Sequence, residues 1–300
     1  MNVTTPCQTS YTPKNALSDG QKLVLIAFDL FSLSMNIFTN SLVIASLKIT
    51  SQLHNLSLRL ILLLSISDIC SALVLQTLFA IMLVNYSDKD YCRFDSFVNF
   101  FGVFFTHISL YIVVVIGLDH FGRMKYLNRY PLIVTKRRVY MTLMAFMSLS
   151  FLQASMYVIG TIFSIFSTTK SIAIFIDVTI GGTAFGLYIV TIFIVKKHRQ
   201  SAQNRQLLAN VDKMFTRLAS CILLALVIFY TPYALISVTH SLLSEKLSWS
   251  EKQALDFLFI LSYVLIYSFS SANATIFLFI NKKAKNLFPK HFSANMLSKK

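Results

Sequence analysis

Charged residues are scarce in this chain. Only 13% of its 300 residues are Asp, Glu, Lys or Arg, whereas a soluble globular domain averages about 25%. Apolar residues make up 55% of the sequence, and the mean hydropathy is +0.65. This composition excludes an ordinary water-soluble domain and indicates a protein that lies in a membrane.

Glycine is also rare, with eight residues in the whole chain. So few glycines leave little room for the loops that bind phosphate groups. The sequence contains no His-Glu zinc motif and no nucleophile elbow, the tight turn that carries a catalytic serine. We therefore expect neither an enzymatic activity nor an organic cofactor.

The four cysteines do not form a disulfide framework, because two of them fall inside apolar segments. Cys70 and Cys221 fall inside apolar segments, so we expect them to be small core residues. Acidic residues are few as well, 12 against 27 basic residues, which gives a net charge of +15. The basic residues gather in the short segments between apolar runs, which argues against nucleic acid as a partner.

Seven apolar segments are long enough to cross a bilayer, which requires about 20 helical residues. They are 23–49, 57–84, 97–119, 139–166, 172–195, 214–243 and 254–280. The first is too long to be the apolar part of a cleaved signal peptide. The sequence thus predicts an all-α membrane protein, a bundle of seven transmembrane helices.

Lys and Arg are distributed unevenly between the connecting segments. If the N-terminus lies outside, 20 of them fall on the cytoplasmic side and seven outside, as expected because cytoplasmic loops are rich in Lys and Arg. The chain then divides into an extracellular tail over 1–22, a membrane domain over 23–280 and a cytoplasmic tail over 281–300. Asn2 and Asn85 begin glycosylation sequons that fall outside.

The C-terminal tail mixes aromatic and basic residues. Phe288 and Phe292 lie among Lys283, Lys285 and Lys290. This pattern favours a short amphipathic helix on the inner leaflet, with its lysines toward anionic membrane lipid. A frayed basic tail is the alternative.

Distinctive residues stand at characteristic places in five of the apolar segments or at their ends: Asn40, Asp68, Asp119 with His120 and Phe121, Pro232, and Asn273 with Phe277. Asp68 follows Asn40 by 28 residues, and His120 follows Asp68 by 52. The order and spacing resemble the marker motifs of rhodopsin-like (class A) G-protein-coupled receptors across all seven segments. The resemblance implies a plasma-membrane receptor that binds an extracellular ligand and signals through a heterotrimeric G protein.

Several markers depart from the family pattern. The family's Asp-Arg-Tyr is Asp119, His120 and Phe121 here, and its Asn-Pro-x-x-Tyr lacks the proline and ends in Phe277. The resemblance implies coupling or switching roles for Asp119, His120, Phe121, Arg123, Asp212, Pro232, Asn273 and Phe277.

We expect Arg123 to begin a basic, loop-like segment that runs to Pro131, and to supply the permanent charge that His120 lacks. One hypothesis pairs Asp212 with His120 or Arg123 in the inactive state. The alternative is three solvated charges at the membrane surface, which contribute little.

The family's ligand pocket maps onto Gly102, Thr106, His107, Tyr230, Tyr233, Tyr263 and Tyr267. Aminergic receptors carry an Asp where Gly102 stands, and opsins a retinal-binding Lys where Tyr267 stands, so neither ligand is expected. The weakly charged, tyrosine-rich pocket and the short loop between the fourth and fifth segments favour a small-molecule ligand. Asp177 is a candidate anchor for a cationic or hydrogen-bonding ligand group, or else it snorkels toward the membrane surface or accepts bonds from neighbouring hydroxyls. Asp29 is a second unusual intramembrane acid.

Two further sites are implied by the resemblance. Asp68, Ser109, Ser270 and Asn273 match the family's sodium site. The alternative is a protonated Asp68 that hydrogen-bonds Asn40 and Asn273 without an ion.

Cys92 lies near the position of the family's conserved outer disulfide cysteine, whose usual partner is missing here. Cys7 is the other candidate outside, so the two either form a bridge or remain free thiols.

Two other functions stay open. A membrane transporter or channel would need polar residues along a continuous path, whereas the charged residues here are separated. A receptor that binds ligand without coupling to G proteins is the other alternative, because the markers in the third, sixth and seventh segments are altered.

Overall fold

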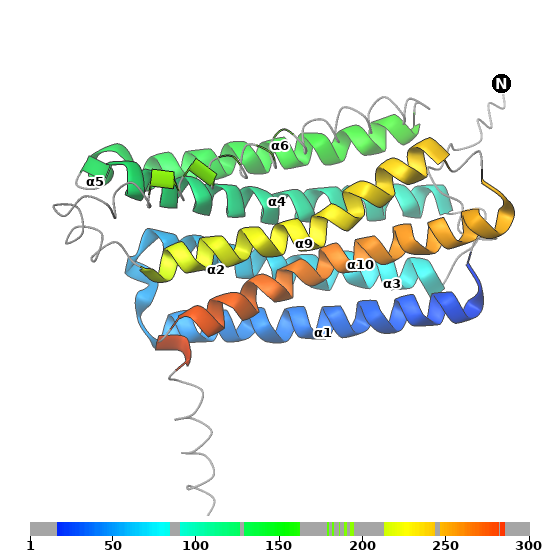
Figure 1. Ribbon diagram of the computed structural model, residues 1–300, viewed down its shortest axis with the longest axis horizontal. Helices are drawn as coiled ribbons and strands as arrows, with labels where there is room; N and C mark the ends of the chain where they lie inside the picture. The colour runs from blue at the N-terminus through cyan, green and yellow to red at the C-terminus, as the bar shows by residue number, and fades with distance from the viewer. Residues whose placement is uncertain are drawn as a thin grey trace, which may run out of the picture.

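The computed structural model describes residues 17–84, 91–126, 129–162, 213–243, 247–281 and 283–285, together with isolated positions between 179 and 194. Every regular element that these stretches contain is helical. The long helices lie roughly side by side along one axis (Figure 1). They are α1 (Asp19–Ile49), α4 (Tyr91–Tyr126), α6 (Lys136–Ile162), α9 (Lys213–Leu243) and α10 (Trp249–Ile280).

The second apolar segment is continuous but contains a π-helical turn. α2 (Leu56–Ser71) leads into η3 (Ala72–Gln76), and α3 (Thr77–Val84) completes the segment. A single 3₁₀ turn, η2 (Gln52–His54), connects it to α1, and the short helix α5 (Tyr130–Ile133) connects α4 to α6. A π turn shifts the facing of the residues that follow it, and here it places Gln76 in the interior.

Six helical segments of the described chain are long and apolar enough to cross a membrane. They are Asp19–Ile49, Leu56–Val84, Ser96–Arg123, Lys136–Met156, Ser220–His240 and Trp249–Ile280. These correspond to six of the seven predicted spans. The predicted fifth span, 172–195, lies almost entirely outside the described residues.

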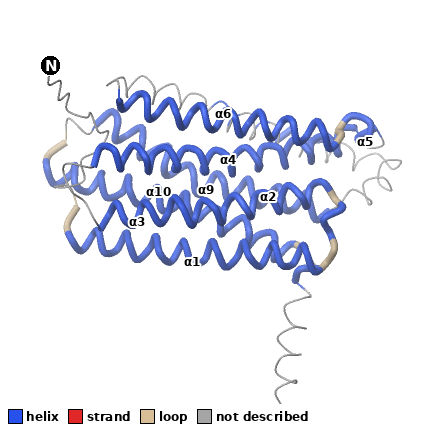
Figure 2. The backbone as a smooth tube through the Cα atoms, turned by 180° about the vertical axis from the view of Figure 1, so that it is seen from behind, coloured by secondary structure: helices blue, strands red, loops and turns tan. Residues whose placement is uncertain are grey.

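The helices form one bundle with two distinct ends. α9 packs along α10, α6 packs along α4, and α1 packs against both α2 and α10. Figures 1 and 2 show α5 at the end of the bundle where α1 finishes and α2 begins. We call this the α5 end. The other end, where α1 and α10 begin, is called the opposite end.

Capping residues set the starts of two helices earlier than hydropathy predicts. Ser18 and Gln21 form reciprocal bonds of 2.9 and 3.3 Å, so that α1 begins at Asp19. Ser248 and Glu251 form the same arrangement before α10, which begins at Trp249. Such capping boxes satisfy the free N–H groups of the first helical turn. The apolar segments, which begin at residues 23 and 254, therefore start later than the two helices do.

α4 is longer than predicted. It continues through Arg123 and Lys125 to Tyr126, so the expected loop-like character of this segment is wrong for its first half. Neither proline nor glycine interrupts the helix between Arg123 and Tyr126, and Arg123 bonds to Asp119 one turn earlier. Pro131 lies in the first turn of α5, where its missing N–H costs nothing.

The interior contains two apolar clusters. The cluster nearer the α5 end includes Leu60, Ile112 and Phe277, and the cluster nearer the opposite end includes Leu75, Phe79 and Tyr267. Large apolar side chains also cover the outside of the bundle, Leu23, Leu132 and Phe279 among them. Cys70 is exposed there and Cys221 is only half-buried, so the expectation that both are core residues is wrong.

Candidate functional site

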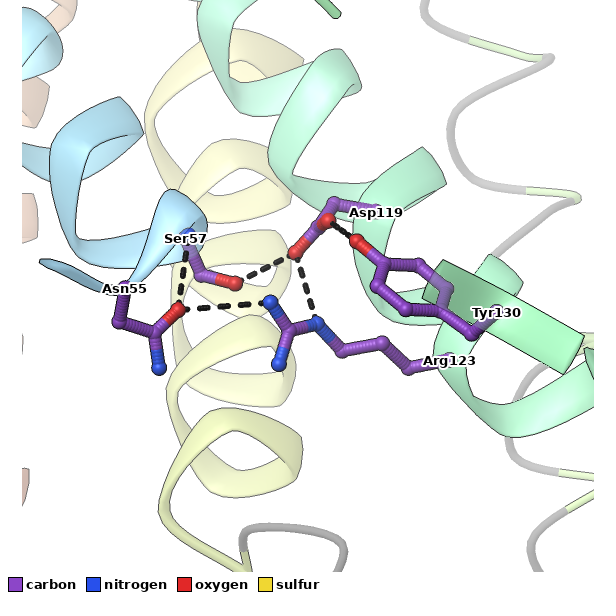
Figure 3. Close-up of polar contacts among 5 residues, drawn as sticks. All are labelled: Asn55, Ser57, Asp119, Arg123 and Tyr130. Carbon is purple, nitrogen blue, oxygen red and sulfur yellow. Dashed lines mark hydrogen bonds and ion pairs between the residues drawn. The ribbon is translucent and has the colours of Figure 1, made fainter. Parts of the chain in front are cut away.

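A polar network lies at the α5 end and joins three elements (Figure 3). Asp119 of α4 is 4% exposed, and its carboxylate accepts three hydrogen bonds. Ser57 of α2 donates to Oδ2, Arg123 donates to Oδ2 through Nε at 3.1 Å, and Tyr130 of α5 donates to Oδ1. Arg123 also donates through Nη2 to Oδ1 of Asn55, at 3.3 Å.

The local sequence explains how this network forms. Asn55 is the N-cap of α2, and its Oδ1 accepts the backbone N–H of Ser57 at 3.0 Å as well as the Arg123 bond. Arg123 follows Asp119 by four residues, which places both on one face of α4. The α5 turn then brings Tyr130 back beneath the same carboxylate, and the Arg123 guanidinium lies 4.9 Å from the centre of the Tyr130 ring.

The network satisfies a group that is expensive to bury. An ionised carboxylate away from water requires a cation and hydrogen bonds, and Asp119 has both. Burial, together with the bond to Asp119, raises the pKa of the Tyr130 phenol above its ordinary value. Tyr130 is therefore a neutral donor throughout the physiological pH range.

His120 lies beside this network without joining it. The side chain is 4% exposed, and neither ring nitrogen has a hydrogen-bond partner among the described residues. Phe121 is half-buried and lies under the Lys125 ammonium, 5.4 Å from the ring centre. The structure therefore brings Asp119 and Arg123 together and leaves His120 and Phe121 out. Asp212 lies outside the described residues, so its pairing with His120 or Arg123 stays a prediction.

A second polar group occupies the middle of the bundle. Ser109 and Ser270 both donate to Oδ1 of Asp68, at 2.7 and 3.0 Å. Oδ2 of Asp68 and both amide atoms of Asn273 are buried without a hydrogen-bond partner in this part of the structure. Asn40 donates to Oδ1 of Asn36 at 2.6 Å, whereas the protonated alternative needs a bond from Asn40 to Asp68.

The residues around Asp68 fit a sodium ion in their chemistry. A hard cation prefers oxygen ligands, and Asp68, Ser109, Ser270 and Asn273 offer a carboxylate, two hydroxyls and an amide oxygen. The free oxygens of Asp68 and Asn273 are the ones that such an ion would engage. Asp68 would supply the charge that balances the ion.

The predicted pocket tyrosines gather in the half of the bundle toward the opposite end. The rings of Tyr233 and Tyr263 have their centres 5.1 Å apart. Tyr230 meets Phe269 edge-on at 5.5 Å, and Tyr267 meets Phe79 edge-on at 5.7 Å. Tyr267 belongs to the apolar cluster nearer the opposite end, and the other three tyrosines pack against that cluster, so these four positions on α9 and α10 belong to one region.

The remaining pocket positions are on α4 or outside the described residues. Gly102 lies against η3, because a Cβ added there would be 3.4 Å from Leu75. Thr106 is half-buried, and His107 is buried with its ring 5.9 Å from that of Tyr111 on the same helix. The other predictions, Asp177, the Cys7–Cys92 bridge and the sequons at Asn2 and Asn85, rest on side chains that the structure does not describe.

The family's proline and its terminal aromatic position have clear places. Pro232 lies inside α9, where it removes one helical hydrogen bond. Phe277 of α10 is fully buried in the apolar cluster nearer the α5 end, so the hydroxyl that the family carries at this position is replaced here by apolar packing.

Sequence reasoning missed two polar features. Asn55, Ser57 and Tyr130 complete the Asp119 network, and the signal for them was the need of Asp119 for partners. The other is a hydrogen-bonded contact between α9 and α10, in which Nε2 of His240 lies 3.0 Å from Oδ1 of Asp256. Both residues stand near the ends of apolar segments, where a polar residue is unremarkable by itself.

A comparison with protein families matches residues 39–277 to the seven-transmembrane receptor (rhodopsin family) model. This match covers most of the chain, from the first predicted span to the last. The chain belongs to the rhodopsin family of seven-transmembrane receptors. It is therefore a receptor-type, multi-pass membrane protein, in agreement with its six described membrane-length helices. A comparison with curated proteins found no match.

Proposed function

We propose that this protein is a plasma-membrane receptor that binds a small extracellular ligand and activates a heterotrimeric G protein from its α5 end. The N-terminus lies outside in this proposal, which places the opposite end toward the ligand. The observation that carries the proposal is the Asp119 network, because it joins α2, α4 and α5 at the end where Lys and Arg are concentrated.

The network provides a resting state that activation can change. Arg123 is held by Asp119 and Asn55, so its charge is neutralised within the bundle. A ligand that favours a second arrangement of α9 and α10 would open the α5 end and release Arg123 toward the G protein. Asp212, which precedes α9, would add a second restraint on the same charge.

A receptor that binds ligand without coupling to G proteins is the second candidate. The buried position of His120, which has no hydrogen-bond partner in the described chain, favours this alternative. The family's arginine at that position is a permanent cation, and a buried imidazole does not replace it.

A screen of G-protein activation decides between these functions. Wild type, His120→Arg and Phe277→Tyr are compared across the Gα classes, with Lys125→Gln as a control on the same helix. We expect wild type to activate one class, and His120→Arg to change the extent of activation. If only His120→Arg activates a G protein, the natural receptor is the non-coupling kind. If no variant activates any class, a transporter or channel function becomes the leading hypothesis.

We further propose that sodium binds at Asp68 and stabilises the resting state. Sodium chloride should then raise the thermal unfolding temperature of the purified receptor more than choline chloride at equal ionic strength. Asp68→Asn should abolish the difference between the two salts because it removes the charged ligand. An equal response of wild type to both salts would favour the ion-free Asp68.

A further inference from the structure

Asp29 is a buried acid that the Asp119 and Asp68 sites leave unexplained. It lies on α1 about 15 Å from the start of the helix, and its side chain is 0% exposed. Neither of its carboxylate oxygens has a hydrogen-bond partner in the described structure. An ionised carboxylate in this condition is costly, so Asp29 requires either its own proton or a positively charged partner from outside the described chain.

A second unpartnered acceptor lies nearby. Gln76 of η3 is 1% exposed, and its Oε1 is buried without a partner within the described residues. Its amide nitrogen donates to Ser32 at 3.2 Å, and Ser32 stands one helical turn after Asp29 on the same face of α1. Ser32 also bonds to Ser268 of α10 at 3.0 Å. Asp29 and Gln76 therefore stand at one level of the bundle, where α1, η3 and α10 meet.

Aromatic side chains lie on a third side of this region, next to Asp29 and Gln76. Tyr267 precedes Ser268 on α10, and the hydroxyl of Ser268 lies 3.0 Å from that of Ser32 on α1. The ring of Tyr267 meets that of Phe79, one turn after Gln76, at 5.7 Å. Tyr233 packs against the apolar cluster that contains Tyr267, so two of the predicted pocket residues lie in this region.

From this arrangement we propose that Asp29, Gln76 and Tyr267 form a recognition site for a monovalent cation. The protonated amino group of a small aromatic or aliphatic amine is the source that the site fits best. A primary ammonium has three N–H donors, and the site offers three oxygens that have no partner among the described residues, two from Asp29 and one from Gln76. The faces of neighbouring aromatic rings also attract organic cations. An inorganic ion such as sodium has the same charge and is the competing source.

This inference rests on the proposed receptor function, since it names the class of ligand. It differs from the aminergic arrangement, in which the acid would stand at Gly102 on α4. Here the acid is on α1, so an amine would be anchored between α1, η3 and α10.

The site can be tested by the thermal stability of the purified receptor in lipid nanodiscs. The probes are benzylammonium and phenethylammonium chloride, their uncharged counterparts benzyl alcohol and 2-phenylethanol, and sodium chloride. Each is titrated against wild type, Asp29→Asn, Gln76→Leu and Asp19→Asn. Asp19 is the matched control because it is an acid of the same helix with a fully exposed side chain.

We expect the ammonium probes, and not the alcohols, to raise the unfolding temperature of wild type and Asp19→Asn. Asp29→Asn should weaken the apparent affinity about tenfold or more, because a charged hydrogen-bond partner is lost, and Gln76→Leu should weaken it less. If sodium is the one probe that stabilises the receptor and this effect requires Asp29, the site remains a cation site and its ligand is an inorganic ion.

Equal responses of wild type and Asp29→Asn to every cation, or no response at all, would overturn the proposal. If Asp29→Asn does not fold, Gln76→Leu and Tyr267→Phe carry the same comparison. The measurement requires no G protein, so it can succeed where the coupling screen fails. Conversely, G-protein activation with no cation dependence at Asp29 would reject this site alone.

Discussion

At the scale of single residues, the Asp119 carboxylate shows how one buried charge organises its surroundings. It accepts hydrogen bonds from a serine of α2, an arginine of its own helix and a phenol of α5. Each of these donors would be ordinary on a protein surface. Their convergence follows from the cost of leaving a buried carboxylate without partners.

Tyr130 gives this network a measurable pH dependence. Burial and the bond to Asp119 raise the pKa of the folded phenol, above the value of about 10 expected in the unfolded chain. The stability that Tyr130 contributes is therefore complete below about pH 10, and it is lost as the pH rises toward the folded pKa. Tyr130→Phe has no phenol and lacks this loss.

The unfolding temperatures of wild type and Tyr130→Phe should therefore differ by a constant amount up to about pH 10, and the difference should shrink above it. Differential scanning fluorimetry across this range measures both. Curves that remain parallel at alkaline pH would contradict the role of the phenol.

The Asp119–Arg123 pair should be energetically coupled. Asp119 is almost fully buried and Arg123 is about one quarter exposed, with 3.1 Å between Oδ2 and Nε. We expect a double-mutant cycle of Asp119→Asn and Arg123→Gln to give a coupling of about 1–3 kcal/mol in reversible unfolding. The same cycle with Lys125→Gln in place of Arg123→Gln should be additive within about 0.5 kcal/mol. Equal results from the two cycles would mean that the ion pair contributes no specific stability.

At the scale of helices, α9 and α10 are joined at the opposite end by His240 and Asp256. Asp256 is 2% exposed, the contact is 3.0 Å long, and the His240 ring stacks on Phe259 at 4.8 Å. In the proposed activation, the α5 end opens and α9 moves relative to α10. This contact therefore restrains the two helices at the end farthest from the G protein.

Asp256→Ala should lower the free energy of unfolding by more than about 1 kcal/mol, since it leaves His240 without its buried acceptor. Asp256→Asn should retain most of the stability because its amide oxygen can still accept the bond. Asp19→Ala removes an exposed acid at the start of α1 and should change stability by less than about 0.5 kcal/mol. Chemical unfolding measures the free energy of unfolding of the three variants. Decreases of equal size in Asp256→Ala and Asp19→Ala would show that the His240–Asp256 contact does not restrain the helices.

At the scale of the whole molecule, hydropathy predicted the six described spans because lipid requires long apolar helices. The helix ends were less predictable, since polar caps at Ser18 and Ser248 set them. The Asp119 network depends on α5 folding back toward α4, and no local pattern in the sequence encodes that turn. Asp29 was visible as an unusual acid, but the buried Gln76 lies in the π turn η3, which shifts the facing of the residues around it and which hydropathy does not predict.

The orientation of the bundle can be tested with the chain's own sequons. With the N-terminus outside, Asn2 and Asn85 should carry glycans, so that Asn2→Gln and Asn85→Gln each increase electrophoretic mobility by one glycan and amidase treatment removes the difference. Asn55 begins a third sequon at the α5 end, where it caps α2 and binds Arg123. In the proposed orientation it faces the cytoplasm, so Asn55→Gln should leave the mobility unchanged. A glycan that is lost in Asn55→Gln and retained in the other two variants would show that the bundle has the opposite orientation. The Asp119 network would then lie outside the cell, where no G protein could reach it.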